Sequence, residues 1–127
     1  MLDMSSILIH IPGELTDLNT YIRAERSNRY FAAKLKKEET ERVAWLSKGH
    51  KIDKYPINIA CNWYLKDRKK DSDNCAFAVK FILDGLVTAG VLENDSQKYI
   101  KSIGHNFEID KDNPRVVVEI KSVDWYH

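Results

Sequence analysis

The stretch that decides the fold is NCAFAVKFILDGLVTAG, residues 74–90. Apolar residues fall on every side of its helical projection, and Lys80 and Asp84 are its only charged residues. We expect Asp73 or Asn74 to cap the start of this helix and the final Ala-Gly pair to close it. A helix that is apolar all round is buried, so this one is predicted to be central, covered by a sheet or by a partner subunit.

Segments on both sides of this helix predict a mixed sheet and two further helices. Thr16 and Asp17 suit the N-cap of a short helix running to Arg26, and Ser27 or Asn28 suits the cap of a longer, charged helix. Strands are predicted where β-branched or alternating residues lie between turn signals. The order β-α-α-β-α-β-β predicts an α+β (mixed α/β) domain. The predicted strands are 7–11, 57–65, 99–109 and 116–120.

The bulk composition indicates one globular domain, 1–127. Hydrophobic residues make up 43% and charged residues 31% of the 127, which excludes a disordered chain. The net charge of +1 does not mark a nucleic-acid binder, so any such role depends on local basic clusters. Cys61 and Cys75 form no CxxC pair and are expected to be reduced thiols. With no signal peptide and no membrane-spanning run expected, the predicted location is the cytoplasm, without a membrane partner.

Two aspartates precede the central helix and a third follows it. Asp71 and Asp73 are two residues apart, so on extended backbone they share a face, and Asp95 lies beyond the helix. Grouped carboxylates are typical ligands of Mg²⁺, and Lys80 could orient an attacking water or stabilise the charge on phosphorus. Each residue also has an ordinary structural alternative: Asp71, Asp73 and Asp95 in turns or caps, and Lys80 paired with Asp84.

The joint pattern is more specific than its parts. The chain carries a basic run followed by D-x-D-N, then a helix with a lysine and D-G-L, then A-G and a final N-D pair. In this order and over residues 68–95 it resembles the RusA family of Holliday junction resolvases, above all its phage and prophage branch. Residues 18–37 also resemble that branch, with weaker motifs. The residues concerned are Arg68 to Asn74, Lys80, Asp84-Gly85-Leu86, Ala89-Gly90 and Asn94-Asp95.

The resemblance implies a RusA-like fold and a homodimer that cuts four-way or branched DNA by paired, symmetric nicks in recombination or repair. It implies Mg²⁺ dependence, with Mn²⁺ as a substitute, and no organic cofactor. The family's three metal-binding carboxylates fall on Asp71, Asp73 and Asp95, and its essential lysine falls on Lys80. Asn94 stands where the better-known bacterial form has a second aspartate.

Two basic groups are the predicted DNA contacts. The first adjoins the carboxylates, and the second lies near the start of the longer helix, where an ordinary solvated face is an equal alternative. Nearby aromatic residues suit base stacking, although core packing is the commoner role. Two functional alternatives remain: a junction-binding module that does not cleave, and a Mg²⁺-dependent nuclease for other branched DNA. The first basic group is Arg68, Lys69 and Lys70, and the second is Arg23, Arg26, Arg29 and Lys34, of which Arg26, Arg29 and Lys34 are the predicted contacts. The aromatic residues are Trp63, Tyr64, Tyr30 and Phe31.

Overall fold

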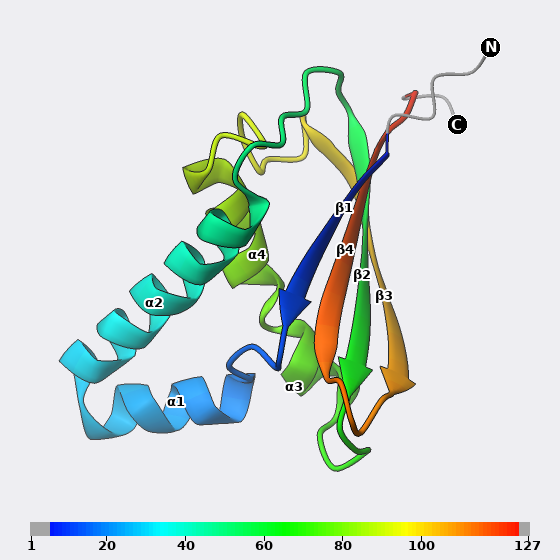
Figure 1. The fold of residues 1–127 in the computed structure, drawn as a ribbon. Coiled ribbons are helices and arrows are strands. Elements are labelled where there is room, and N and C mark those ends of the chain that lie inside the picture. The colour runs from blue at the N-terminus through cyan, green and yellow to red at the C-terminus, as the bar shows by residue number, and fades with distance from the viewer. Residues whose placement is uncertain (1–5, 125–127) are drawn as a thin grey trace.

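The computed structural model describes residues 6–124 and has two layers, a sheet and a group of helices that cover one of its faces (Figure 1). The described residues form four strands and four helices. They are β1 (Ser6–Pro12), α1 (Leu18–Ser27), α2 (Arg29–Ser47), β2 (Ile57–Leu65), α3 (Ser72–Ala76), α4 (Val79–Thr88), β3 (Ile100–Ile109) and β4 (Arg115–Ser122).

The sheet is mixed, as the sequence predicts, with strand order β1-β4-β2-β3. The neighbours β1 and β4 are antiparallel, as are β4 and β2, whereas β2 and β3 are parallel. A parallel pair needs a crossover, and α3 and α4 supply it. Burial alternates along β2, whose odd-numbered residues from Ile57 to Leu65 are buried. The last of them, Leu65, leads into the loop that carries the candidate carboxylates.

The prediction of a central buried helix is confirmed for α4, which lies between α2 and the sheet in Figure 1. Phe81, Ile82 and Leu86 are fully buried in the main hydrophobic cluster. The chain's own sheet therefore covers one side of α4, and α2 covers the other. Asp17 and Asn28 cap α1 and α2, and each accepts a hydrogen bond from the backbone of the first turn.

The prediction of one continuous helix over 74–90 is wrong, because the segment forms α3 and α4 with a break at Phe77 and Ala78. The backbone tightens there: the N–H of Ala78 donates to Cys75 O, and that of Phe81 donates to Ala78 O. Cys75 and Ala78 are both buried, so core packing favours the break although the sequence has no Gly or Pro there. Lys80 consequently lies in the first turn of α4.

None of the helices in the described part of the chain is both long enough and apolar enough to span a membrane.

Candidate active site

Asp71 and Asp73 lie at the start of α3, directly after the loop that follows β2. The prediction that Asp73 or Asn74 caps the helix is wrong, because Asp71 is the N-cap residue, although its side chain makes no capping hydrogen bond. Asp73 is in the first turn, where its Oδ1 accepts a hydrogen bond of 3.0 Å from the N–H of Asn74. Both residues are exposed. The structure thus brings these two predicted residues together, with carboxylate oxygens left open to a ligand.

Lys80 is exposed in the first turn of α4. Its Nζ lies 5.7 Å from the centroid of the Phe77 ring. Among the described residues it forms no ion pair with Asp84, although the four-residue spacing allows one. The ammonium is therefore held at the end of α4 that is nearer to Asp73, over an aromatic face rather than by a carboxylate.

Asp95 lies elsewhere, in the segment beyond the far end of α4. It lines an open groove of about 670 Å³ between α2 and α4, beside the neighbouring Asn94. The groove is also lined by Asp84 from α4 and by charged residues of α2, including Lys36 and Glu41. Within the described residues no group of three or more acidic, His or Cys side chains is placed to hold a metal ion. The structure therefore does not unite Asp95 with Asp71 and Asp73 in one chain.

The basic residues in front of Asp71 divide into two kinds. Arg68 and Lys69 are exposed. Lys70 is partly buried, and its Nζ lies 3.3 Å from Glu14 Oε1 and 3.1 Å from Asp17 Oδ2. Burial alone would lower the pKa of Lys70, but the two carboxylates outweigh it, so its pKa is raised. Lys70 is charged and engaged within the protein, whereas Arg68 and Lys69 are open to phosphates.

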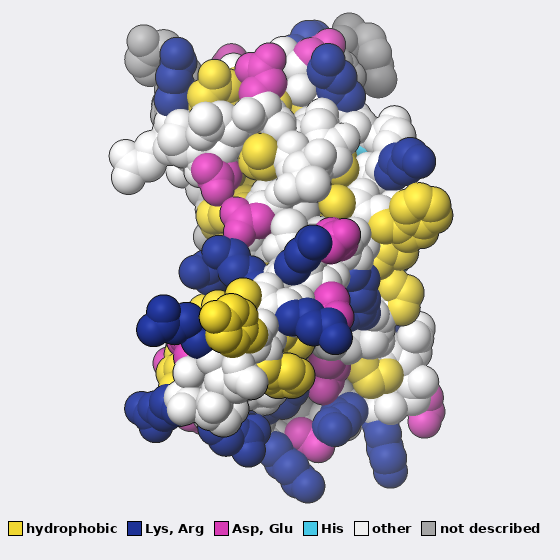
Figure 2. Space-filling model, turned by 90° about the vertical axis from the view of Figure 1, so that its left-hand side faces the viewer, with side chains coloured by type: hydrophobic (Ala, Val, Ile, Leu, Met, Phe, Trp, Pro, Cys, Tyr) yellow, Lys and Arg dark blue, Asp and Glu magenta, His cyan; other side chains and the backbone are white. Residues whose placement is uncertain are grey.

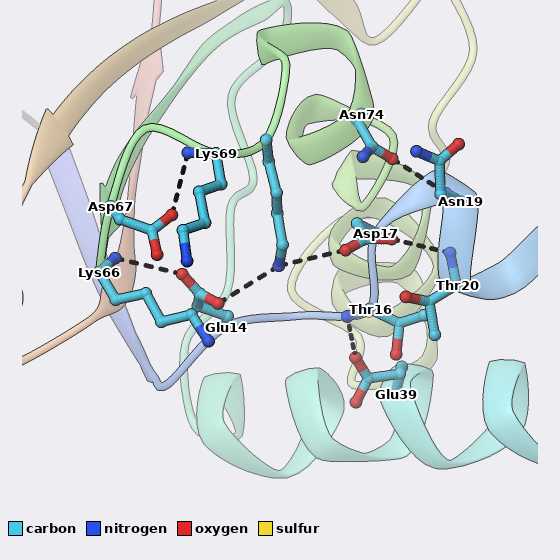
Figure 3. Close-up of polar contacts among 11 residues, drawn as sticks. Glu14, Thr16, Asp17, Asn19, Thr20, Glu39, Lys66, Asp67, Lys69 and Asn74 are labelled. Atoms are coloured by element: carbon cyan, nitrogen blue, oxygen red, sulfur yellow. Dashed lines mark hydrogen bonds and ion pairs between the residues drawn. The ribbon is translucent and has the colours of Figure 1, made fainter.

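Sequence reasoning missed Glu14 altogether. Figure 3 shows this residue facing the loop that carries Lys66 and Lys69. The N–H of Lys66 donates to Glu14 Oε2 at 3.2 Å. Nothing in the sequence around position 14 marks this role, because the contact joins residues 52 positions apart. Asp17 was predicted as a helix cap, but its ion pair with Lys70 is likewise a long-range contact.

The second basic group lies at the corner between α1 and α2. Arg26 is in the last turn of α1, Arg29 is the first residue of α2, and both are exposed. Lys34 is exposed too, with only a long contact of 3.8 Å to Glu38. Figure 2 looks onto the helical layer, and Lys and Arg side chains gather over its lower half.

Two aromatic side chains stand among these basic residues. Tyr30 is 84% exposed and Phe31 is 55% exposed, so neither packs into the core. The expectation of core packing is confirmed for Trp63, which is buried. Tyr64, on the opposite face of β2, lies under the guanidinium of Arg115, 3.9 Å from its ring centroid.

The chain matches a known protein family. The family model described as Endodeoxyribonuclease RusA matches residues 12–121, which is most of the chain and runs from the last residue of β1 almost to the end of β4. No curated protein matches the chain.

Proposed function

The chain belongs to the RusA family of endodeoxyribonucleases, whose members resolve Holliday junctions, and we propose that it is a Mg²⁺-dependent enzyme that cuts four-way or branched DNA by paired, symmetric nicks. The observation that carries the proposal is the exposed pair Asp71 and Asp73 beside Arg68 and Lys69, within the matched region. The activity would serve recombination or repair of phage or prophage DNA in the cytoplasm of a bacterial host.

The donor set at the start of α3 fits a hard divalent cation. Asp71 uses no side-chain oxygen for capping, and Asp73 uses one, for the N–H of Asn74. Carboxylate oxygens of this kind suit Mg²⁺, and Mn²⁺ as a substitute. When bound, the cation supplies an activated water and neutralises charge on the phosphate. The role of Lys80 is to donate hydrogen bonds to the same phosphate or water, since its ammonium is exposed on the near end of α4.

Asp95 would reach such a site from a second copy of the chain. It follows α4, whereas Asp71 and Asp73 precede it, and the ten residues of α4 span about 15 Å. A C₂ homodimer creates two identical sites, each with Asp71 and Asp73 from one copy and Asp95 from the other. Two linked sites also match the two strands that must be cut to resolve a four-way junction.

The surface we propose for this dimer is β3. It is an edge strand in the described sheet, and it exposes Ile103 (38%), Phe107 (36%) and Ile109 (39%) on the face that packs against the helices elsewhere. An edge strand with apolar side chains is a ready surface for pairing with another chain. Antiparallel pairing of two β3 strands would place the segment containing Asp95 of one copy near the end of the partner's β2, which leads into its Asp71.

DNA would lie across the exposed basic residues. Arg68 and Lys69 are placed to hold the phosphates next to the cut. Further contacts are assigned to Arg26, Arg29 and Lys34, and the exposed rings of Tyr30 and Phe31 are available to stack on unpaired bases at the junction centre.

The experiment that tests the proposal is cleavage of a labelled four-way junction beside a linear duplex of equal length, with Mg²⁺ and with Ca²⁺. We expect paired symmetric nicks in the junction with Mg²⁺ alone. Asp73→Asn should abolish cleavage while keeping the fold. Asp53→Asn, which changes an exposed aspartate between α2 and β2, should cleave normally. Tight junction binding without cleavage would favour the binding module instead. Cleavage of flaps in preference to four-way junctions would favour the nuclease for other branches.

A further inference from the structure

The chain is held on both sides of Asp71, by the segment between β1 and α1 and by the start of α1. Before Asp71, Glu14 accepts the N–H of Lys66 at 3.2 Å and contacts Lys70 Nζ at 3.3 Å. After it, Asn74 Oδ1 accepts the N–H of Asn19 at 2.9 Å. These contacts join parts of the chain 52 to 56 positions apart. Asp71 and Asp73 thus lie in a segment that is held by hydrogen bonds at both of its ends.

The charges at this contact are partly buried. The side chain of Glu14 is 18% exposed and that of Asp17 is 11% exposed, with Lys70 between them at 29%. Ion pairs this far from solvent are screened less than surface pairs, and removing one partner leaves the other charge unpaired. Asp17 also accepts the N–H of Thr20 at 2.8 Å, so the contact is anchored to the start of α1.

By contrast, α3 has few internal hydrogen bonds that could fix its orientation. It has five residues, and Asp71 provides no side-chain cap. One helical turn is unfavourable to form in isolation, because several residues are ordered for each hydrogen bond gained. The direction of Asp71 and Asp73 therefore depends on contacts from outside α3, which are the burial of Cys75 in the core and the contacts that hold the loop.

We propose that Glu14 is a positioning residue, which acts through Lys66 and Lys70 to hold Asp71 and Asp73 in the orientation that binds the cation. This inference rests on the proposed function, because it concerns the same site. Glu14 does not touch the cation or the DNA. Together with Asp17 it keeps Lys70 paired, so that Arg68 and Lys69, not Lys70, face the phosphates.

The first test separates positioning from DNA binding by comparing Glu14→Ala and Glu14→Gln with the unchanged protein. Junction affinity is measured with Ca²⁺, and the cleavage rate is measured across a Mg²⁺ titration. In Glu14→Ala we expect cleavage to fall about 10- to 100-fold and half-maximal activity to need more Mg²⁺. Junction binding should stay equal or become tighter, because Lys70 loses one of its two carboxylate partners. Glu14→Gln should lie between, because its amide oxygen can still accept the Lys66 N–H.

The matched control is Asp53→Ala, which removes an exposed carboxylate in the segment between α2 and β2. It should leave cleavage, Mg²⁺ demand and junction affinity unchanged. Equal losses of binding and cleavage in the Glu14 variants would indicate a general loss of fold and overturn the proposal. Full cleavage by folded Glu14→Ala would overturn it as well.

A second measurement does not depend on cleavage. The N–H of Cys75 donates to Asp71 O at 3.1 Å and so reports the first turn of α3 by hydrogen exchange. Glu14→Ala should speed this exchange and should raise the Mn²⁺ concentration that broadens the amide signal of Asp73. If the unchanged protein neither cleaves nor binds Mn²⁺, the proposed function fails, yet exchange at Cys75 still decides the role of Glu14. If the Cys75 amide of Glu14→Ala exchanges at the same rate as in the unchanged protein, the positioning role of Glu14 is overturned.

Discussion

Gly85 of α4 lies against Val43 of α2, so close that a Cβ on Gly85 would stand 2.6 Å from the Cβ of Val43. The same Cβ would be 2.9 Å from the carbonyl oxygen of Thr40. Real side chains do not approach one another this closely. The two helices keep their spacing because position 85 has no side chain, and this close packing seats α4 between α2 and the sheet.

Gly85→Ala should therefore destabilise the protein by about 1–3 kcal/mol, because overpacking shifts α4 away from α2. The loss is expected although alanine has the higher intrinsic helix propensity, by about 1 kcal/mol. Gly104→Ala is the control, since a Cβ there meets nothing within 4 Å. Urea unfolding measures both variants. A stabilised Gly85→Ala protein would contradict the close approach of the two helices.

Much of the fold is predictable because local sequence patterns determine its strands and helix caps. The predicted strand at 57–65 matches β2, and the caps at Asp17 and Asn28 match the starts of α1 and α2. The break between α3 and α4 was not predictable, since no Gly or Pro marks it and buried contacts of Cys75 and Ala78 decide it. Propensity describes neighbours in sequence, whereas this break depends on neighbours in space.

The candidate site likewise has residues that local sequence patterns predict and residues whose positions depend on contacts distant in sequence. Asp71 and Asp73 are near each other because they are two positions apart, but the prediction that extended backbone puts them on one face is wrong, because Asp73 lies in the first turn of α3. Asp95 is separated from them by a helix, and its position depends on how the chain turns after α4. Glu14 is not recognisable from sequence, because its partners lie more than 50 positions away.

His105 should make the stability of the protein depend on pH. Its Nδ1 accepts a hydrogen bond of 2.9 Å from Trp63 Nε1, and burial lowers the pKa of its imidazole below the usual 6.5. Since the unfolded chain then takes up the proton more readily, stability falls as the pH falls from about 7 to about 5. His105→Gln should remove this part of the pH dependence, and His50→Gln, at an exposed position, should not. Urea unfolding at several pH values measures it, and identical profiles for His105→Gln and the unchanged protein would contradict it.

Asp17 should contribute stability that is lost only in acid. Burial would raise its pKa, but hydrogen bonds from Thr20 and Lys70 outweigh this and hold the pKa below 3.8. The contribution is therefore present above that value and disappears as the pH falls through the lowered pKa. Asp17→Asn keeps an oxygen for the Thr20 N–H and loses the ion pair, so Asp17→Ala should be less stable than Asp17→Asn by about 1 kcal/mol. Equal stability of the two variants at neutral pH would show that the cap contributes nothing.

Phe107→Lys should convert the proposed dimer into a folded monomer. The ring is 36% exposed on the edge strand β3, and a lysine there would put a charge from each copy into the proposed interface. Light scattering gives the mass, and circular dichroism checks that the fold is retained. Leu8→Lys is the control, because Leu8 is 51% exposed on β1, at the opposite edge. A monomer formed by Leu8→Lys but not by Phe107→Lys would place the interface on β1.

Mixing two inactive variants tests whether each site takes aspartates from both copies. Asp73→Asn and Asp95→Asn chains, each carrying a different affinity tag, are co-expressed and the mixed dimer is purified through both tags. If Asp95 serves the partner's Asp71 and Asp73, one site of the mixed dimer carries both changes and the other carries none. That dimer should nick four-way junctions in one strand at about half of the normal rate per dimer, with the paired cut lost. If all three aspartates act within one chain, each site carries one change and the mixed dimer stays inactive.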